Sequence, residues 1–96
     1  IQNDDFCEAQ MRMFDIPAKW KAFGWNVKEI DGHNMQEVVE GMEYLSNTNN
    51  GPSILIAHTV KGHGVSFMAD NPAFHGAAPN DEQYAQAMAE LGEVVA

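Results

Sequence analysis

A short apolar run between chain breakers most constrains the fold of this chain. The sequence SILIAHT, at residues 53–59, follows Pro52 and precedes a segment that contains two glycines. A continuous apolar run of this length is typical of a strand that is buried on both faces, as in a parallel sheet. The sequence WNVKEID, at residues 25–31, predicts a second strand that ends before Gly32.

A helix is expected between these two strands. Asn34 is a good N-cap, and Glu37 stands three residues later, which is the pattern of a capping box. Apolar residues then repeat at helical spacing, at Met35, Val38, Val39, Met42 and Leu45. A right-handed strand–helix–strand crossover gives parallel pairing and therefore an α/β fold. Because two parallel strands do not form a stable sheet alone, we expect part of a doubly wound, mostly parallel sheet.

Two further helices are expected on either side of this unit. The first has Asp15 as N-cap, Pro17 in its first turn, and Gly24 at its end. The second has Asn80 as N-cap and Gln83 at the capping-box position. Each has an apolar face at helical spacing, formed by Ile16, Trp20 and Phe23 in the first helix and by Tyr84, Met88 and Leu91 in the second.

Composition narrows the possible partners. The chain has 96 residues and a formal net charge of −9, which disfavours nucleic acid and anionic membranes. The single cysteine excludes an internal disulfide and fits a reducing, cytoplasmic compartment. The apolar run at residues 54–57 is too short to span a bilayer. The chain begins with Ile1 rather than methionine, so we interpret it as starting inside a longer protein.

One segment of this acidic chain carries no acidic residue. No Asp or Glu lies between Glu43 and Asp70, and this span contains Lys61, Gly62 and Gly64. The glycines would let backbone N–H groups approach a phosphate, and the lysine would add a positive charge. The segment lacks the spacing of a P-loop, and a flexible turn is the alternative interpretation.

The four histidines differ as candidates for chemistry. His33 flanks a helix start, His58 ends a strand, and His63 lies between two glycines. No cysteine or second carboxylate nearby completes a zinc site with His58 and His63. His75 is the strongest candidate, because it lies in a loop with two prolines and a glycine. Its imidazole can donate a hydrogen bond to a phosphate or a substrate oxygen.

Four segments together resemble the transketolase family, and more narrowly the N-terminal subunit of split, two-chain transketolases. These segments are DIPAKWKAFGW, EIDGHN, IAHTVKGHGVSFM and FHGAAPND, and the resemblance runs from residue 1 to about residue 92. It implies that residues 1–96 are the C-terminal portion of a thiamine diphosphate-binding domain. The implied activity is the transfer of a two-carbon ketol unit between sugar phosphates, in the pentose phosphate pathway, with thiamine diphosphate and Mg²⁺.

The resemblance also implies roles for particular residues. His75 matches a family histidine that contacts the cofactor diphosphate and the substrate, and would therefore be both catalytic and cofactor-binding. Lys61, Gly62 and Gly64 match a family glycine loop beside the cofactor. Ile1 matches the residue whose backbone carbonyl binds the metal. Carbanion chemistry would belong to the cofactor itself.

The resemblance further implies a partner. The Gly-Asp-Gly metal motif of the family and its asparagine do not occur in these 96 residues. The glutamate that activates the thiamine ring belongs to a pyrimidine-binding domain, on another chain in split forms. We therefore expect a homo- or hetero-oligomer, a dimer in its simplest form, and an inactive fragment.

Three alternatives stay open. One is a related thiamine diphosphate enzyme with other substrates, such as a deoxyxylulose-phosphate synthase or a sulfo-sugar transketolase. Another is a non-catalytic interaction module that kept the sheet and lost the metal site. The third is an independent small domain that binds anions through Gly62 and Gly64.

Overall fold

The structure is a computed structural model that describes residues 1–95, with side chains described for residues 1–92. Its contacts divide the chain into two units. One unit is Met13–Thr59, and the other combines Ile1–Arg12 with the chain from Val60 onward.

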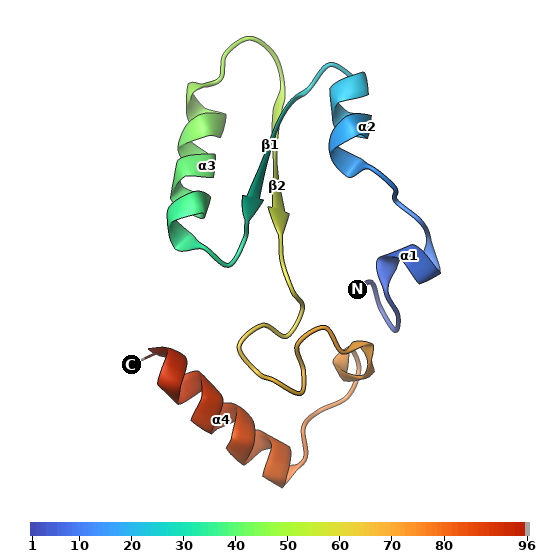
Figure 1. Cartoon of the computed structure of the whole chain (residues 1–96), viewed down its shortest axis with the longest axis vertical. Coiled ribbons are helices and arrows are strands. Elements are labelled where there is room, and N and C mark those ends of the chain that lie inside the picture. Colours follow the sequence, from blue (N-terminus) through green and yellow to red (C-terminus); the bar gives the residue numbers. More distant parts are fainter. Residues whose placement is uncertain (96) are drawn as a thin grey trace. The chain divides into compact units, whose positions relative to one another are not determined.

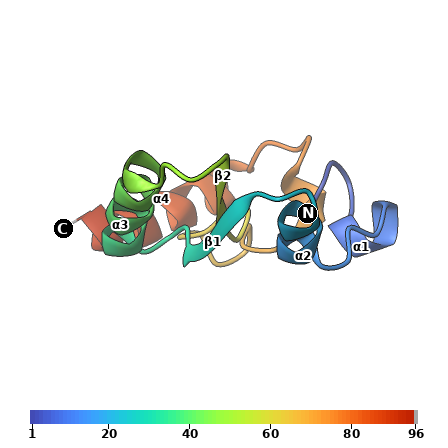
Figure 2. The same ribbon diagram turned by 90° about the horizontal axis from the view of Figure 1, so that it is seen from above.

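The unit of residues 13–59 is a strand–helix–strand arrangement with a preceding helix. Its elements are α2 (Ile16–Ala22), β1 (Asn26–Asp31), α3 (Met35–Asn47) and β2 (Ser53–His58). The strands pair in parallel, in a register that runs from Asn26 opposite Ser53 to Asp31 opposite His58. The two strands lie between α2 and α3 in both ribbon views (Figure 1, Figure 2). The expected α/β fold is confirmed.

Local hydrogen bonds explain where α2 begins and ends. Oδ1 of Asp15 accepts a hydrogen bond from the backbone N–H of Ala18 at 2.9 Å, as expected of an N-cap. Gly24 closes the helix with a φ of +86°, a left-handed conformation that glycine adopts without strain. The apolar face was only partly predicted, because Ile16 is half-buried whereas Phe23 is exposed.

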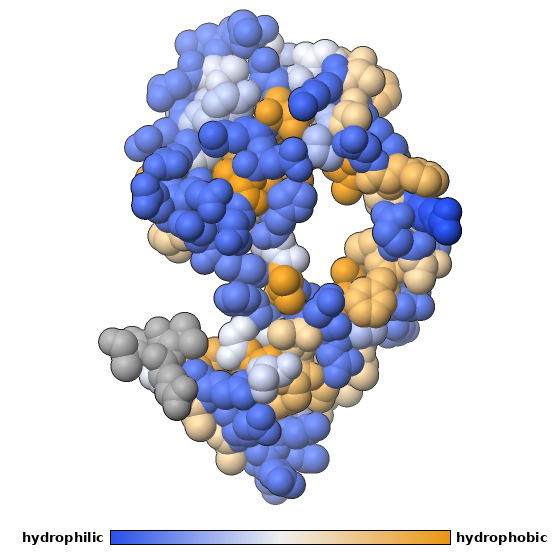
Figure 3. Space-filling view, viewed as in Figure 1, coloured by the Kyte–Doolittle hydropathy of each residue, from blue (hydrophilic) through white to orange (hydrophobic). Residues whose placement is uncertain are grey.

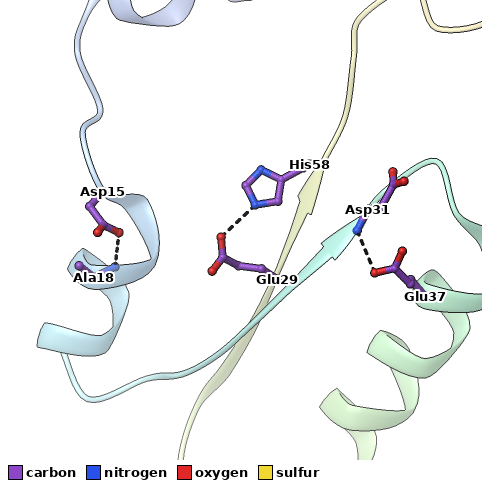
Figure 4. Close-up of polar contacts among 6 residues, drawn as sticks. All are labelled: Asp15, Ala18, Glu29, Asp31, Glu37 and His58. Carbon is purple, nitrogen blue, oxygen red and sulfur yellow. Dashed lines mark hydrogen bonds and ion pairs between the residues drawn. The ribbon is translucent and has the colours of Figure 1, made fainter.

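The cap of α3 differs in one respect from the predicted capping box. Oδ1 of Asn34 accepts from the backbone N–H of Glu37 at 3.2 Å, as predicted. The Glu37 carboxylate, however, accepts from the backbone N–H of Asp31 at 3.4 Å rather than from Asn34 (Figure 4). The Asn34 N–H is already bonded to the Asp31 carbonyl, so the box is one-sided.

The core of this unit lies between α3 and the sheet. Ile30 is 4% exposed, and Gly41 of α3 is buried against Leu55. A Cβ on Gly41 would come within 2.8 Å of the Leu55 methyl groups, so the glycine permits the helix to approach the strand closely.

The expected burial of β2 was wrong. Residues 53–56 of β2 are half-buried rather than buried on both faces, because among the described residues β2 pairs only with β1. The apolar repeat of α3 also divides between two faces. Val38 and Leu45 are half-buried, whereas Met35, Val39 and Met42 are 73%, 51% and 56% exposed.

The other unit contains α1 (Cys7–Gln10), the 3₁₀ turn η1 (Pro72–Phe74) and α4 (Asp81–Val95). The capping box of α4 is complete. Oδ1 of Asn80 accepts from the Gln83 N–H at 2.8 Å, and Oε1 of Gln83 accepts from the Asn80 N–H at 2.9 Å. Ala87 is buried, so the face of α4 that packs is the one centred on this alanine.

The predicted apolar face of α4 is not its buried face. Tyr84, Met88 and Leu91 share one side of the helix and remain exposed in the structure. Apolar residues are visible at the surface of both units in the space-filling view (Figure 3). Within the described part of the chain, no helix has the length and apolar character needed to cross a membrane.

Candidate functional site

The segment that follows β2 in the chain is a series of tight turns. Gly62 and Gly64 have φ values of +80° and +98°. The N–H of His63 donates to the Val60 carbonyl at 3.1 Å, and the N–H of Val65 donates to the Gly62 carbonyl at 3.2 Å. A Cβ on Gly62 would lie 2.5 Å from the Met68 carbonyl oxygen. Glycine is therefore required at residue 62 both by its φ value and by this close approach.

Backbone and side-chain hydrogen bonds hold the loop that carries His75, between β2 and α4. The N–H of Asp70 donates to the Lys61 carbonyl at 2.9 Å, which joins the two ends of the first turn series. Asn71 then links two turns, because its Nδ2 donates to the Phe67 carbonyl at 3.0 Å and its Oδ1 accepts from the Ala73 N–H at 3.1 Å. The loop is thus folded back on itself rather than extended.

Two aromatic rings and a short 3₁₀ turn fix the last part of this loop. The rings of Phe67 and Phe74 lie 5.4 Å apart between centroids, in a tilted arrangement. The N–H of His75 donates to the Pro72 carbonyl at 3.1 Å. These contacts determine where the His75 backbone lies relative to the glycine turns.

The result is a direct contact between Lys61 and His75. The ammonium Nζ of Lys61 lies 2.6 Å from Nδ1 of the His75 ring, and both residues are exposed. A lysine ammonium carries only donors, so Nδ1 accepts this hydrogen bond and the ring proton belongs on Nε2. The arrangement offers an ammonium and an imidazole N–H to solvent at one place, which suits an anionic ligand.

The loop is anchored to α4 by a carboxylate that sequence reasoning missed. The N–H of Ser66 donates to Oε2 of Glu90 at 2.7 Å, and the Ser66 hydroxyl donates to Oε1 at 2.6 Å. Gln86, one turn earlier, also donates to Oε1 at 3.2 Å. The hydrogen bonds from Ser66, and then that from Gln86, lower the pKa of the Glu90 carboxyl. The available signal was the spacing of Gln86 and Glu90, which lie on one helix face.

Two of the other histidines have hydrogen bonds of their own. Nε2 of His58 lies 2.9 Å from Oε1 of Glu29, in an exposed hydrogen bond between the two strands (Figure 4). His33 follows β1, where its backbone N–H donates to Oδ1 of Asp31 at 2.9 Å.

The N-terminal residues form a small turn next to Ile1. Gln2 and Asp5 are joined by two backbone hydrogen bonds of 2.9 and 3.4 Å, and Asn3 between them has a φ of +58°. Ile1 is half-buried. The described residues contain no group of three or more His, Cys, Asp or Glu side chains that could hold a metal ion.

An apolar cleft beside α2 is a poor candidate for an anion site. The cleft has a volume of about 250 Å³ and is lined by Met13, Ile16, Lys19, Trp20 and Phe23. Its lining is almost entirely apolar, and the Lys19 ammonium lies 5.9 Å from the centre of the Phe14 ring. The cleft therefore lacks the donors that an anionic ligand requires.

Comparison with known proteins identifies similar sequences. A family model described as the transketolase, thiamine diphosphate binding domain matches residues 5–94. An apulose-4-phosphate transketolase subunit of Phocaeicola vulgatus is 37% identical over 93 residues, which are 97% of this chain and 33% of that protein. The 6-deoxy-6-sulfo-D-fructose transketolase subunit SqwG of a Clostridium species is 35% identical over 91 residues, which are 95% of this chain and 33% of that protein.

A third relative is similar over a smaller share of its length. Transketolase 2 of Escherichia coli is 35% identical over 79 residues, which are 81% of this chain and 12% of that protein. The chain spans about a third of the length of the two subunit relatives.

Proposed function

We propose a function from the premise that this chain belongs to the transketolase family, in its thiamine diphosphate binding domain. The chain forms part of a thiamine diphosphate-dependent enzyme that transfers a two-carbon ketol unit between sugar phosphates. The names of two relatives describe them as subunits, which supports a second, pyrimidine-binding chain in the active assembly. These 96 residues are expected to be inactive alone.

The observation that carries this proposal is the 2.6 Å contact between Lys61 and His75. A diphosphate is a dense anion, and its oxygens accept hydrogen bonds most strongly from charged donors. Lys61 supplies such a donor, and His75 supplies an N–H at Nε2. Both residues are exposed, so a ligand can reach them. The residues present therefore fit the diphosphate end of the cofactor.

The glycines would support this role through the backbone. Gly62 and Gly64 have positive φ values and, as glycines, carry no side chain at two positions that closely follow Lys61. A phosphate could therefore come close to the main chain there. We propose that both glycines line the diphosphate site.

The described residues do not form a metal site by themselves. Among them no group of three or more His, Cys, Asp or Glu side chains is arranged so that it could hold a metal ion. We propose only that the backbone carbonyl of Ile1 is one oxygen ligand of Mg²⁺, a cation that prefers oxygen donors. The remaining ligands would come from residues outside this sequence.

The chain's own residues would bind and orient the cofactor and the substrate and would not act as nucleophiles. When bound, thiamine diphosphate supplies the carbanion chemistry of ketol transfer. Lys61 balances the negative charge of the diphosphate. His75 donates its Nε2 proton in a hydrogen bond to a diphosphate or substrate oxygen, and it holds that oxygen near the reacting centre.

The test is a ketol-transfer assay of the complete protein with its partner chain. Transfer from a ketose phosphate to an aldose phosphate should require both chains, thiamine diphosphate and Mg²⁺. Assays with apulose 4-phosphate and 6-deoxy-6-sulfo-D-fructose, the compounds in the relatives' names, would determine the substrate. The absence of transfer with every substrate, in a folded assembly, would contradict the proposal.

A non-catalytic interaction module remains the competing hypothesis. Such a module would keep the α/β scaffold but bind no cofactor. A titration of the same assembly with thiamine diphosphate, with and without Mg²⁺, separates the two functions. Metal-dependent binding supports the enzyme, whereas a folded assembly without such binding supports the interaction module.

A further inference from the structure

We infer that Lys61 is a positioning residue that fixes the tautomer and the orientation of the His75 ring. The catalytic consequence of this inference depends on the proposed function, but its structural content does not. The inference gives Lys61 a second task besides binding the diphosphate. That task is to act through His75, before any cofactor binds.

The chemistry of the contact determines the direction of the hydrogen bond. Nζ of Lys61 lies 2.6 Å from Nδ1 of His75, which is a short hydrogen bond. An ammonium has three N–H donors and no lone pair. Nδ1 must therefore present its lone pair, and the neutral ring carries its proton on Nε2. The second nitrogen of a histidine is commonly set in this way by the partner of the first.

Hydrogen bonds hold the backbone of both residues in the contact. The Lys61 carbonyl accepts the Asp70 N–H at 2.9 Å, which fixes the backbone of the lysine. The His75 N–H donates to the Pro72 carbonyl at 3.1 Å, and Phe74 packs on Phe67. Both backbones are held by separate hydrogen bonds, which place the two residues where their side chains can meet.

The functional consequence concerns what His75 can offer. With Nδ1 occupied, the ring presents Nε2–H as a hydrogen-bond donor to an incoming oxygen. A ring that turned over or exchanged its proton would present an acceptor to the same oxygen part of the time. Lys61 removes that alternative and so reduces the cost of ordering the ring when the ligand binds.

The first experiment observes the ring without cofactor. In the complete protein labelled with ¹⁵N at histidine, at a pH where the ring is neutral, we expect the ¹⁵N signals of His75 to show a proton on Nε2 and a hydrogen-bonded acceptor at Nδ1. Lys61→Met should shift both signals toward those of a ring that exchanges between tautomers. Lys61→Arg, which also only donates, should retain the original pattern.

A matched control removes the same charge elsewhere. Lys21→Met alters an exposed lysine at the end of α2 and should leave the His75 signals unchanged. A proton on Nδ1 in the unmodified protein would overturn the inference. So would unchanged His75 signals in Lys61→Met.

The second experiment separates positioning from direct diphosphate binding. In the active assembly, Lys61→Met should lower turnover about threefold to tenfold, as expected for loss of one exposed charged hydrogen bond. If Lys61 acts partly through His75, this loss should be smaller in a His75→Ala background, where only its contact with the diphosphate remains to be lost. Losses that multiply independently would show that Lys61 acts on the diphosphate alone, and would overturn the functional part of the inference.

The two experiments distinguish a wrong proposed function from a wrong positioning role. If the assembly has no ketol-transfer activity but the ¹⁵N pattern and its Lys61 dependence are observed, the proposed function is wrong and the positioning contact stands. If the assembly is active but the pattern does not depend on Lys61, the proposed function stands and the positioning role is wrong.

Discussion

Residues 26–58 and residues 60–92 reach defined conformations by different means. The first region has a regular parallel register and a helix that packs on it through Ile30, Gly41 and Leu55. The second has one helix and a long loop, and this loop is held by a hydrogen bond that Asn71 donates and by one that Glu90 accepts. Periodic apolar packing specifies the first region, whereas individual polar side chains specify the second.

This difference assigns separate tasks to the two regions. A regular unit tolerates exchange of its exposed residues but depends on a few buried ones. A loop that is held by hydrogen bonds of individual side chains can bring an ammonium and an imidazole together. An apolar periodic pattern does not specify such a contact. We therefore expect substitutions in residues 26–58 to act on stability, and substitutions of the two side chains that meet in residues 60–92, Lys61 and His75, to act on activity.

The largest effect is expected at His75. His75→Ala should lower turnover of the complete assembly by about 10²–10⁴-fold, because the donor to the substrate or diphosphate oxygen is lost. His58→Ala removes another exposed histidine, from the first region, and its exposed pair with Glu29 contributes little to stability. Steady-state kinetics of both variants test whether activity depends on the second region rather than the first. Near-normal turnover of His75→Ala would contradict this assignment.

The next largest effect is expected in the core of the first region. Ile30 is 4% exposed, so Ile30→Ala should lower the free energy of unfolding by about 2–5 kcal/mol. Ile30→Val removes one methylene and should cost only about 0.5–1.5 kcal/mol. Denaturant unfolding of the complete protein measures both values. If both variants lost the same small free energy of unfolding, the packing of Ile30 would not be what stabilises this region.

A smaller loss of stability is expected at Gly62. Gly62→Ala places a Cβ 2.5 Å from the Met68 carbonyl oxygen at a φ of +80°, which should cost about 1–3 kcal/mol. Gly76→Ala is the matched control, because a Cβ there meets nothing within 4 Å and its φ lies outside the left-handed region. Thermal melts compare the two variants, and equal melting temperatures would show that the turn is not constrained.

The smallest effect is a pH dependence of loop anchoring. The pKa of Glu90 is lowered in the folded protein by its hydrogen bonds to Ser66. The carboxylate therefore stabilises the loop above the unfolded-state pKa of about 4.5, and this contribution is lost as the pH falls through the lower folded value. Hydrogen exchange at the Ser66 amide should accelerate, relative to its intrinsic rate, over that acidic range.

The control for this pH dependence is Glu90→Gln. An amide at residue 90 does not titrate, so its Ser66 amide should exchange faster at neutral pH and lack the acidic transition. The same acidic transition in Glu90→Gln would show that another group is responsible.

The sequence predicted the elements of this chain better than it predicted their burial. Asp15, Asn34 and Asn80 were identified as N-caps because capping depends on neighbouring backbone N–H groups. The faces of α3 and α4 were harder to predict. Periodicity groups Met42 with Val38, and Met88 with Tyr84, but it does not show which side of a broad apolar stripe packs.

The candidate site was predicted in part, for a similar reason. Lys61 and His75 were singled out by residue type and by the family resemblance, but their contact spans fourteen positions of loop and depends on turns at Gly62 and Asp70. Glu90 was not identified, because a glutamate on a helix surface is ordinary. The role of Glu90 in anchoring the loop is visible only in the structure, where Ser66 donates two hydrogen bonds to its carboxylate.

The most direct test of the account is a calorimetric titration of thiamine diphosphate into the complete assembly in the presence of Mg²⁺. The account predicts metal-dependent binding that weakens in His75→Ala and in Lys61→Met, whereas Lys21→Met binds as the unmodified protein does. Binding that is unaffected by both site variants, or a folded assembly that binds no thiamine diphosphate, would contradict it.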